Sequence, residues 1–368
     1  MDTLTLYDKY VLATYTRLPI ILVRGQGIKV WDSRGREYLD FFPGWAVSGI
    51  GHCHPGVVDA VQRQLKKIIH VSNNYYNELQ GRLAQKISEN SFSGKVFFCN
   101  SGAEASESAI KLARAYGHPD RYEILSMEGS FHGRTLAAMT ATGQEKYHKG
   151  FGPLPKGFTH VPFNNLEAIK AKAGKRTIAV LIELIQGEGG INIAGERFVR
   201  ALRRFCTDKD ILLIIDEVQT GMGRTGRFFA YQHYGIEPDI MTMAKTLGGG
   251  MPIGAMIAGE EFASILKPGT HASTFGGSPI VCAASLAVFD AIEKDGLIKN
   301  AEMMGKYLKD RLNKLKERHS IIKEIRGMGL MLGVELKSPG KDIVEGCIAK
   351  GLLINCTHNT VLRLMPPM

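Results

Sequence analysis

Short continuous apolar runs alternate, through the middle of the chain, with longer stretches in which apolar residues recur every three or four positions. The run 211–215 is typical of a strand buried on both faces, whereas 103–116 places its apolar residues on one helical face. This alternation predicts a mostly parallel central sheet with helices on both faces, an α/β fold. Strands are predicted over 95–99, 122–126, 178–184, 211–216 and 253–258, and helices over 55–67, 103–116, 196–207, 279–293 and 297–318.

The predicted helices and strands are shorter at the two ends of the chain. Strands are predicted near the start over 20–23, 28–31 and 38–42, and near the end over 321–326, 330–336, 352–355 and 361–364, with a helix over 342–350. We interpret these ends as a smaller α+β domain. The predicted division is a segment 1–50 that joins the small domain, a large domain 51–295, and a C-terminal small domain 296–368.

Composition narrows the classes of protein. Of 368 residues, 44% are hydrophobic and 22% charged, as in ordinary globular enzymes. No run approaches the roughly 18 apolar residues of a membrane helix, and the start lacks the pattern of a signal peptide, so we expect a cytoplasmic protein without a membrane partner. The six cysteines are scattered, which argues against disulfides and structural zinc.

The net charge of +10 raises the question of nucleic acid. Basic residues mostly alternate with acids, as in 306–311, which is typical of a solvated helix face. Nucleic acid is therefore not an expected partner, but a small anionic ligand suits the charge. No metal is expected either, because His52, Cys53 and His54 are adjacent, and neighbours in an extended segment point to opposite faces.

One glycine pattern offers a misleading signal. Residues 221–226 satisfy G-x-G-x-x-G soon after an apolar strand, which suggests a nucleotide-dependent oxidoreductase. However, the helix that should start at the third glycine is replaced by Arg-Phe-Phe-Ala-Tyr, and no acid-tipped strand follows about 20 residues later. This alternative is kept only as a remote one.

Three other features combine into one chemistry. Asp216 ends a buried strand, where α/β sheets bind ligands, and Lys245 lies in an apolar, glycine-rich setting that would lower the pKa of its amine. The turn 100–103 joins a strand to a helix and offers backbone N–H groups to a phosphate. Together they indicate a phosphorylated pyridine aldehyde bound as a Schiff base, with its ring nitrogen paired to the acid.

From about residue 17 to its end, the chain resembles the class III (ornithine-type) aminotransferases, which depend on pyridoxal 5′-phosphate and have the type I fold of that cofactor's transferases. The motifs that carry the resemblance are NSGAEA at 100–105, SFHGRT at 130–135, IQGEGG at 185–190, DEVQTG at 216–221, and Lys245 followed by STFGG at 273–277. Five motifs in order make chance agreement negligible.

The resemblance implies roles around the cofactor ring. Lys245 would form the Schiff base and carry the proton in the 1,3-shift, and Asp216 would keep the ring nitrogen protonated. Phe131 would stack on one ring face and Val218 pack on the other, although the pattern alone would place both in the core. Gln219 would bind the ring hydroxyl.

The resemblance also implies a phosphate site shared between subunits. Ser101, Gly102 and Ala103 would bind the phosphate of their own subunit. Thr274 would reach the phosphate of the neighbouring one, which predicts a homodimer with active sites at the interface.

Substrate residues follow from the same resemblance. Arg363 would grip the α-carboxylate of glutamate, because a guanidinium binds a carboxylate through two parallel bonds. Glu188 would mask Arg363 when a terminal amine reacts, and Arg134, with Ser273 nearby, would bind the second carboxylate or acetylated end. Arg363 as a surface cation and Glu188 as an ordinary loop acid remain alternatives.

Within the family, the match is best to members acting on N2-acetyl-L-ornithine, which implies transfer of its δ-amino group to 2-oxoglutarate in arginine synthesis. Ornithine, 4-aminobutyrate, or an N-succinylated or carrier-linked diamine are alternative donors. Trp45 replaces a smaller aliphatic residue near the substrate, and the chain ends at Met368, where the family continues with a helix, so it looks truncated. A scaffold without activity is disfavoured because Asp216, Lys245, Arg134 and Arg363 occur together.

Overall fold

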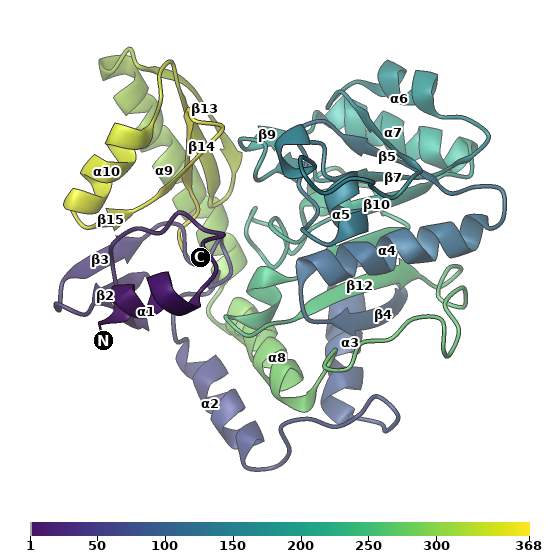
Figure 1. Cartoon of the computed structure of the whole chain (residues 1–368), viewed down its shortest axis with the longest axis horizontal. Coiled ribbons are helices and arrows are strands. Elements are labelled where there is room, and N and C mark those ends of the chain that lie inside the picture. Colours follow the sequence, from purple (N-terminus) through teal and green to yellow (C-terminus); the bar gives the residue numbers. More distant parts are fainter. Residues whose placement is uncertain (1) are drawn as a thin grey trace.

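A seven-stranded sheet forms the core of the larger part of the molecule in this computed structural model, which describes residues 2–368 (Figure 1). The strand order is β4-β12-β11-β10-β7-β5-β6. In that order the bounds are Gly94–Cys99, Gly254–Gly259, Ile240–Met243, Leu212–Asp216, Thr177–Ile182, Glu123–Met127 and Phe158–Val161.

The strands of this sheet run mostly parallel, as predicted. β10 pairs in parallel with both β7 and β11, and β5 pairs in parallel with β6 and β7. Only β12 is antiparallel to its neighbours β11 and β4. The carboxyl ends of the parallel strands therefore meet at one edge, where α/β sheets bind ligands.

Helices cover both faces of the sheet because its strands are apolar on both sides. In β10, Leu212 and Ile214 pack with α4 (Gly102–Gly117), and α5 (Leu136–Ala141) covers the same face. Leu213 and Ile215 pack toward the opposite layer. That layer is made of α3 (Glu78–Asn90), α7 (Glu196–Asp208) and α8 (Pro279–Lys294), with α6 (Leu166–Lys172) beside them.

The two ends of the chain share one small sheet. β1 (Leu22–Gln26), β2 (Lys29–Asp32) and β3 (Glu37–Asp40) form an antiparallel meander, and β15 (Leu352–Leu353) joins β3 in parallel. A second sheet has the order β13-β14-β17-β16, with bounds Ile322–Met328, Met331–Leu336, Val361–Leu364 and Asn355–Thr357. α9 (Leu297–Arg318) and α10 (Lys341–Ala349) pack beside these sheets (Figure 1). The boundaries at 50 and 295 stay predictions.

The remaining elements are short or peripheral. α1 spans Thr3–Tyr10 and α2 spans Pro55–Leu65, and three single turns of 3-10 helix are η1 (Glu145–Tyr147), η2 (Ala230–His233) and η3 (Lys245–Gly248). β8 (Ile185–Gln186) and β9 (Asn192–Ile193) form a small ribbon beside the main sheet. Among residues 2–368, no helix has both the length and the apolar character needed to cross a membrane.

Candidate active site

A cavity of about 430 Å³ lies at the carboxyl edge of the parallel strands and gathers most of the predicted site residues. Its lining includes Ser101, Gly102, Ala103, Phe131, Arg134, Glu188, Asp216, Val218, Gln219 and Lys245. These residues come from five separate segments of the chain. Their convergence is the result that the sequence motifs predicted.

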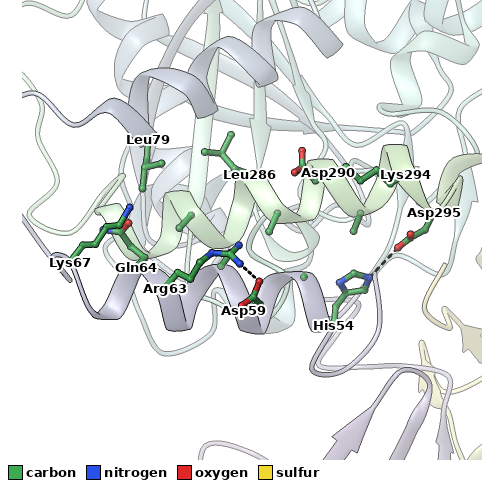
Figure 2. Close-up of a pocket in the computed structure, with 15 residues that line it drawn as sticks. His54, Asp59, Arg63, Gln64, Lys67, Leu79, Leu286, Asp290, Lys294 and Asp295 are labelled. Carbon is green, nitrogen blue, oxygen red and sulfur yellow. Dashed lines mark hydrogen bonds and ion pairs between the residues drawn. The ribbon is translucent and has the colours of Figure 1, made fainter.

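A second hollow, of about 420 Å³, lies between α2 and α8 and contains none of the predicted site residues (Figure 2). His54 lies at one end of it, with Nε2 3.2 Å from Asp295 Oδ2. His52 Nε2 instead lies 2.9 Å from Asp40 Oδ2. The two histidines thus face different partners, and within residues 2–368 no group of three potential ligands is placed to hold a metal.

Asp216 is the last residue of β10 and its side chain is buried. Its Oδ1 accepts a hydrogen bond from the Val218 backbone N–H at 3.0 Å, and its Oδ2 lies 2.8 Å from Nδ1 of the buried His132. One ring nitrogen of His132, Nε2, has no partner among residues 2–368. His132 belongs to the motif at 130–135, but the sequence predicted no role for it because 84 residues separate it from Asp216.

Glu183 is a second buried carboxyl group that sequence reasoning missed. Its Oε2 accepts from the Phe131 backbone N–H at 2.8 Å, and its Oε1 accepts from the Gly187 N–H at 3.2 Å. Burial, reinforced by the charge of Asp216 and opposed by His132, raises the pKa of Glu183 to about 7. Glu183 therefore fixes the position of Phe131 and of the turn that carries Glu188.

Lys245 begins η3 in a left-handed backbone conformation, with φ of 48°. Non-glycine residues rarely adopt such a conformation, which occurs at sites that the surrounding structure holds in place. Burial lowers the pKa of the Lys245 amine, while the carboxylates of Glu188 and Asp216 oppose that shift. A lowered pKa increases the neutral fraction of the amine, which is the nucleophilic form.

The cavity fits pyridoxal phosphate in two respects. Gly102 and Ala103 lie in the first turn of α4, where backbone N–H groups have no carbonyl partner within the helix and favour an anion. Gln219 Oε1 is buried without a hydrogen-bond partner in the part of the chain described. An unpartnered buried oxygen is costly, and a bound ligand with a hydroxyl group would satisfy it.

Arg363, in β17, is one of the most deeply buried charged residues, at 1% exposure. Its Nη1 lies 2.7 Å from Glu188 Oε1 and donates to the Gly187 carbonyl at 3.0 Å, while its Nε donates to Asn355 Oδ1 at 2.9 Å. Its guanidinium also lies 5.6 Å from the ring of Trp45. The alternative of Arg363 as a surface cation is thus wrong.

The other predicted substrate residues are less uniform in position. Arg134 is exposed at the mouth of the cavity. Ser273 and Thr274 line a separate hollow, where Ser273 Oγ accepts from Asn100 Nδ2 at 3.2 Å. Ser273 and Thr274 are therefore not part of the lining of the cavity that Arg134 lines.

The glycine pattern at 221–226 does not form a nucleotide-binding turn. It leads into the short η2 rather than a long helix, and the Arg224 guanidinium within it is fully buried against the Leu330 carbonyl, 3.2 Å away. A Cβ on Gly223 would lie 3.0 Å from Met368 Sδ. These glycines allow close contact between the large and small parts of the fold.

Comparison with known proteins agrees with this geometry. The model of the family "Aminotransferase class-III" matches residues 10–368. The chain belongs to this family. Members are pyridoxal-phosphate-dependent transaminases, so this protein is such an enzyme and pyridoxal phosphate is its cofactor.

Two curated relatives are similar over nearly their whole lengths. The acetylornithine aminotransferase of Caldanaerobacter subterraneus subsp. tengcongensis is 53% identical, covering 99% of this chain and 94% of the relative. The acetylornithine aminotransferase of Methanocaldococcus jannaschii is 52% identical, covering 99% of this chain and 92% of the relative.

Solved structures agree as well. Ornithine aminotransferase from Toxoplasma gondii superposes with a TM-score of 0.95 at 34% identity, covering 99% of this chain and 89% of that one. Acetylornithine aminotransferase from Elizabethkingia anophelis superposes with a TM-score of 0.88 at 32% identity, covering 99% of this chain and 92% of that one.

A third buried carboxyl group, Glu217, lies beside Asp216 but faces away from the cavity lining. It accepts a bond from the Tyr231 backbone N–H at 2.9 Å and another from the Thr220 hydroxyl. Burial raises the pKa of Glu217 to about 7. This group makes the stability of the fold depend on pH.

The close packing of Gly102 predicts a loss of cofactor affinity on substitution. A Cβ at this position would lie 2.8 Å from Val218 Cγ1, so Gly102→Ala must displace Val218 or the start of α4. We expect the Kd for pyridoxal phosphate, measured by absorbance titration, to rise about tenfold or more. Gly81→Ala, in α3, is the control, because nothing lies within 4 Å of its Cβ. Unchanged affinity for pyridoxal phosphate in Gly102→Ala would contradict a phosphate site at the start of α4.

Glu217 predicts how stability varies with pH. The unfolded carboxyl group loses its proton near pH 4.5, whereas the folded one retains it to about 7. Stability from Glu217 is therefore complete below pH 4.5 and is lost as the pH rises to 7. Relative to Glu217→Gln, the wild-type unfolding free energy in urea should fall by up to about 3 kcal/mol over this interval. The exposed Glu196→Gln variant should parallel the wild type, and a parallel course for Glu217→Gln would refute the assignment.

Proposed function

We propose that the enzyme moves the δ-amino group of N2-acetyl-L-ornithine to 2-oxoglutarate. The products are N-acetyl-L-glutamate 5-semialdehyde and L-glutamate, and the reaction is a step of arginine synthesis. The names of the relatives at 52–53% identity, which are acetylornithine aminotransferases, support this donor. The paired positions of Arg363 and Glu188 carry the proposal, because they suit an enzyme whose two substrates differ at the reacting end.

Pyridoxal phosphate supplies a carbonyl that takes up the amino group and a ring that withdraws electrons from the reacting carbon. In the proposed site, the buried carboxylate of Asp216, which His132 fixes in position, would pair with the ring nitrogen and favour its protonated form. Lys245, whose buried amine has a lowered pKa, would hold the cofactor through its Nζ and would serve there as the group that accepts and returns a proton. Phe131 and Val218, which line the cavity, would pack against the ring, and the unpartnered Gln219 Oε1 would accept a hydrogen bond from its hydroxyl.

The phosphate is proposed to bind at the start of α4. The Ser101 side chain caps the helix by accepting from the Glu104 N–H at 3.2 Å. The N–H groups of Gly102 and Ala103 are thereby left to point at the anion, where the helix dipole adds to their attraction.

The Arg363–Glu188 ion pair accounts for the choice between substrates. A donor that reacts through its terminal amine carries no carboxylate at the reacting carbon, so a free Arg363 would be an unpaired buried charge. Glu188 neutralises Arg363 in this state, with the 2.7 Å contact seen here. 2-Oxoglutarate carries a carboxylate beside its keto group, and its binding would displace Glu188 and take the same guanidinium.

The far end of each substrate is proposed to meet Arg134. Its exposed guanidinium can bind either the second carboxylate of 2-oxoglutarate or the acetyl carbonyl of the donor. Trp45 is half exposed, and the centroid of its ring lies 5.6 Å from the guanidinium carbon of Arg363.

We further propose a homodimer with Thr274 contributing to the neighbouring cofactor site. Large apolar side chains are exposed near the start of the chain and around residues 68–76, namely Leu4, Leu6, Tyr10, Leu12, Tyr15, Leu18, Ile68, Ile69, Tyr75, Tyr76 and Phe275. Such a concentration of exposed apolar surface is typical of a protein interface. The cytoplasmic location stays a prediction from the sequence.

A donor profile with one charge variant tests the proposal. We expect kcat/KM for N2-acetyl-L-ornithine to exceed that for ornithine, 4-aminobutyrate and N-succinylornithine by about tenfold or more. In Glu188→Ala, unmasked Arg363 should favour glutamate, lowering the ratio of acetylornithine to glutamate turnover by about tenfold. The control Glu167→Ala removes a surface pair with Lys170 and should keep the wild-type ratio. Preference for another donor, or an unchanged ratio in Glu188→Ala, would reject the proposal.

A further inference from the structure

Arg134 lacks the kind of partner that usually fixes an arginine. It follows the turn after β5, is exposed, and within residues 2–368 its guanidinium forms no ion pair but lies over aromatic rings. The guanidinium carbon is 4.0 Å from the centroid of the Tyr147 ring and 5.6 Å from that of Phe131. Its donors therefore remain available while the face of a ring sets its plane.

The Tyr147 ring is itself held in place. It meets the Phe131 ring edge-on, with centroids 5.5 Å apart and an interplanar angle of 76°. The Tyr147 backbone N–H donates to the Gln144 carbonyl at 3.0 Å. Gln144 Nε2 in turn donates to the Ser130 carbonyl at 3.0 Å. The turn carrying Tyr147 is thus bonded to the turn carrying Phe131 and Arg134.

We propose that Tyr147 is a positioning residue for substrate specificity, which aims the Arg134 guanidinium at the far end of both substrates. The inference rests on the proposed role of Arg134. It adds that the selectivity for a distant carboxylate or acyl carbonyl depends on an aromatic ring that is not itself part of the cavity lining.

The electrostatics of the ring favour this role. The electron-rich face of a tyrosine attracts a cation without using any of its hydrogen-bond donors. Lys146 Nζ also lies 4.7 Å from the same ring centroid, so positive charge gathers at this mouth of the cavity. A dicarboxylate or an acylated amino acid, with its acceptor group far from the reacting carbon, matches that charge. A short diamine lacking such a group gains nothing from it.

The test compares Tyr147→Leu with Tyr147→Phe in the holoenzyme. Tyr147→Phe keeps an aromatic face and should retain wild-type kinetics to within about twofold. Tyr147→Leu should raise KM for both N2-acetyl-L-ornithine and 2-oxoglutarate by about three- to tenfold. Its kcat, and its kcat/KM for 1,4-diaminobutane, which has no distant acceptor group, should stay near wild type. Tyr147→Met carries the same expectation should the leucine variant fail to fold.

Two further variants separate the possible outcomes. Tyr122→Leu removes another ring beneath an arginine, since the Arg176 guanidinium lies 5.8 Å from its centroid outside the cavity, and should leave all constants unchanged. Arg134→Leu should lose the same discrimination as Tyr147→Leu, or more. If Tyr147→Leu leaves both KM values unchanged while Arg134→Leu raises them, the inference fails and the proposed function stands. If Arg134→Leu leaves both KM values unchanged, the proposed role of Arg134 fails. Equal loss of kcat for every substrate in Tyr147→Leu would show a structural role and overturn the inference.

Discussion

A buried carboxylate at the end of a parallel strand is the constraint around which this site is arranged. Asp216 lies in a low-dielectric interior, where an unpartnered charge would be strongly unfavourable. The Val218 N–H and His132 stabilise it, and the protonated ring of the cofactor is its proposed third partner. The chain after β10 must therefore turn sharply back over the strand end, and the loop with His132 must cross to meet it.

The topology of the sheet brings the other groups to the same place. Lys245 follows β11, which pairs with β10 so that Thr242 lies beside Asp216. The turn 100–103, where the phosphate is proposed to bind, follows β4. Strand β12, which lies between β4 and β11 in the sheet, has to pass close to this turn. A Cβ on Gly254 of β12 would lie only 2.2 Å from the Ser101 carbonyl oxygen, so this glycine permits the close approach. The sheet that contains β17 places Arg363 2.7 Å from Glu188, which lines the cavity.

The sequence predicted the layered fold because continuous apolar runs and helical periodicity reflect burial directly. It predicted neither the strand order nor the reversed direction of β12, since pairing depends on contacts between distant segments. Most of the residues that line the cavity could be predicted because they lie in local motifs. His132 and Glu183 were missed as working residues because their partners are remote, and only the structure shows that Glu183 holds the Phe131 backbone. Tyr147 belongs to no recognised motif, and its contact with Arg134 is visible only in three dimensions.

The proposed mechanism depends most on Lys245, which is proposed to hold the cofactor beside Asp216. Borohydride reduction of the resting holoenzyme, followed by peptide mass spectrometry, tests this directly. We predict that the reduced pyridoxyl group is attached to Lys245 Nζ, and that Lys245→Ala binds the cofactor without covalent attachment and loses transamination. Attachment at another lysine, or full transamination by Lys245→Ala, would contradict the account.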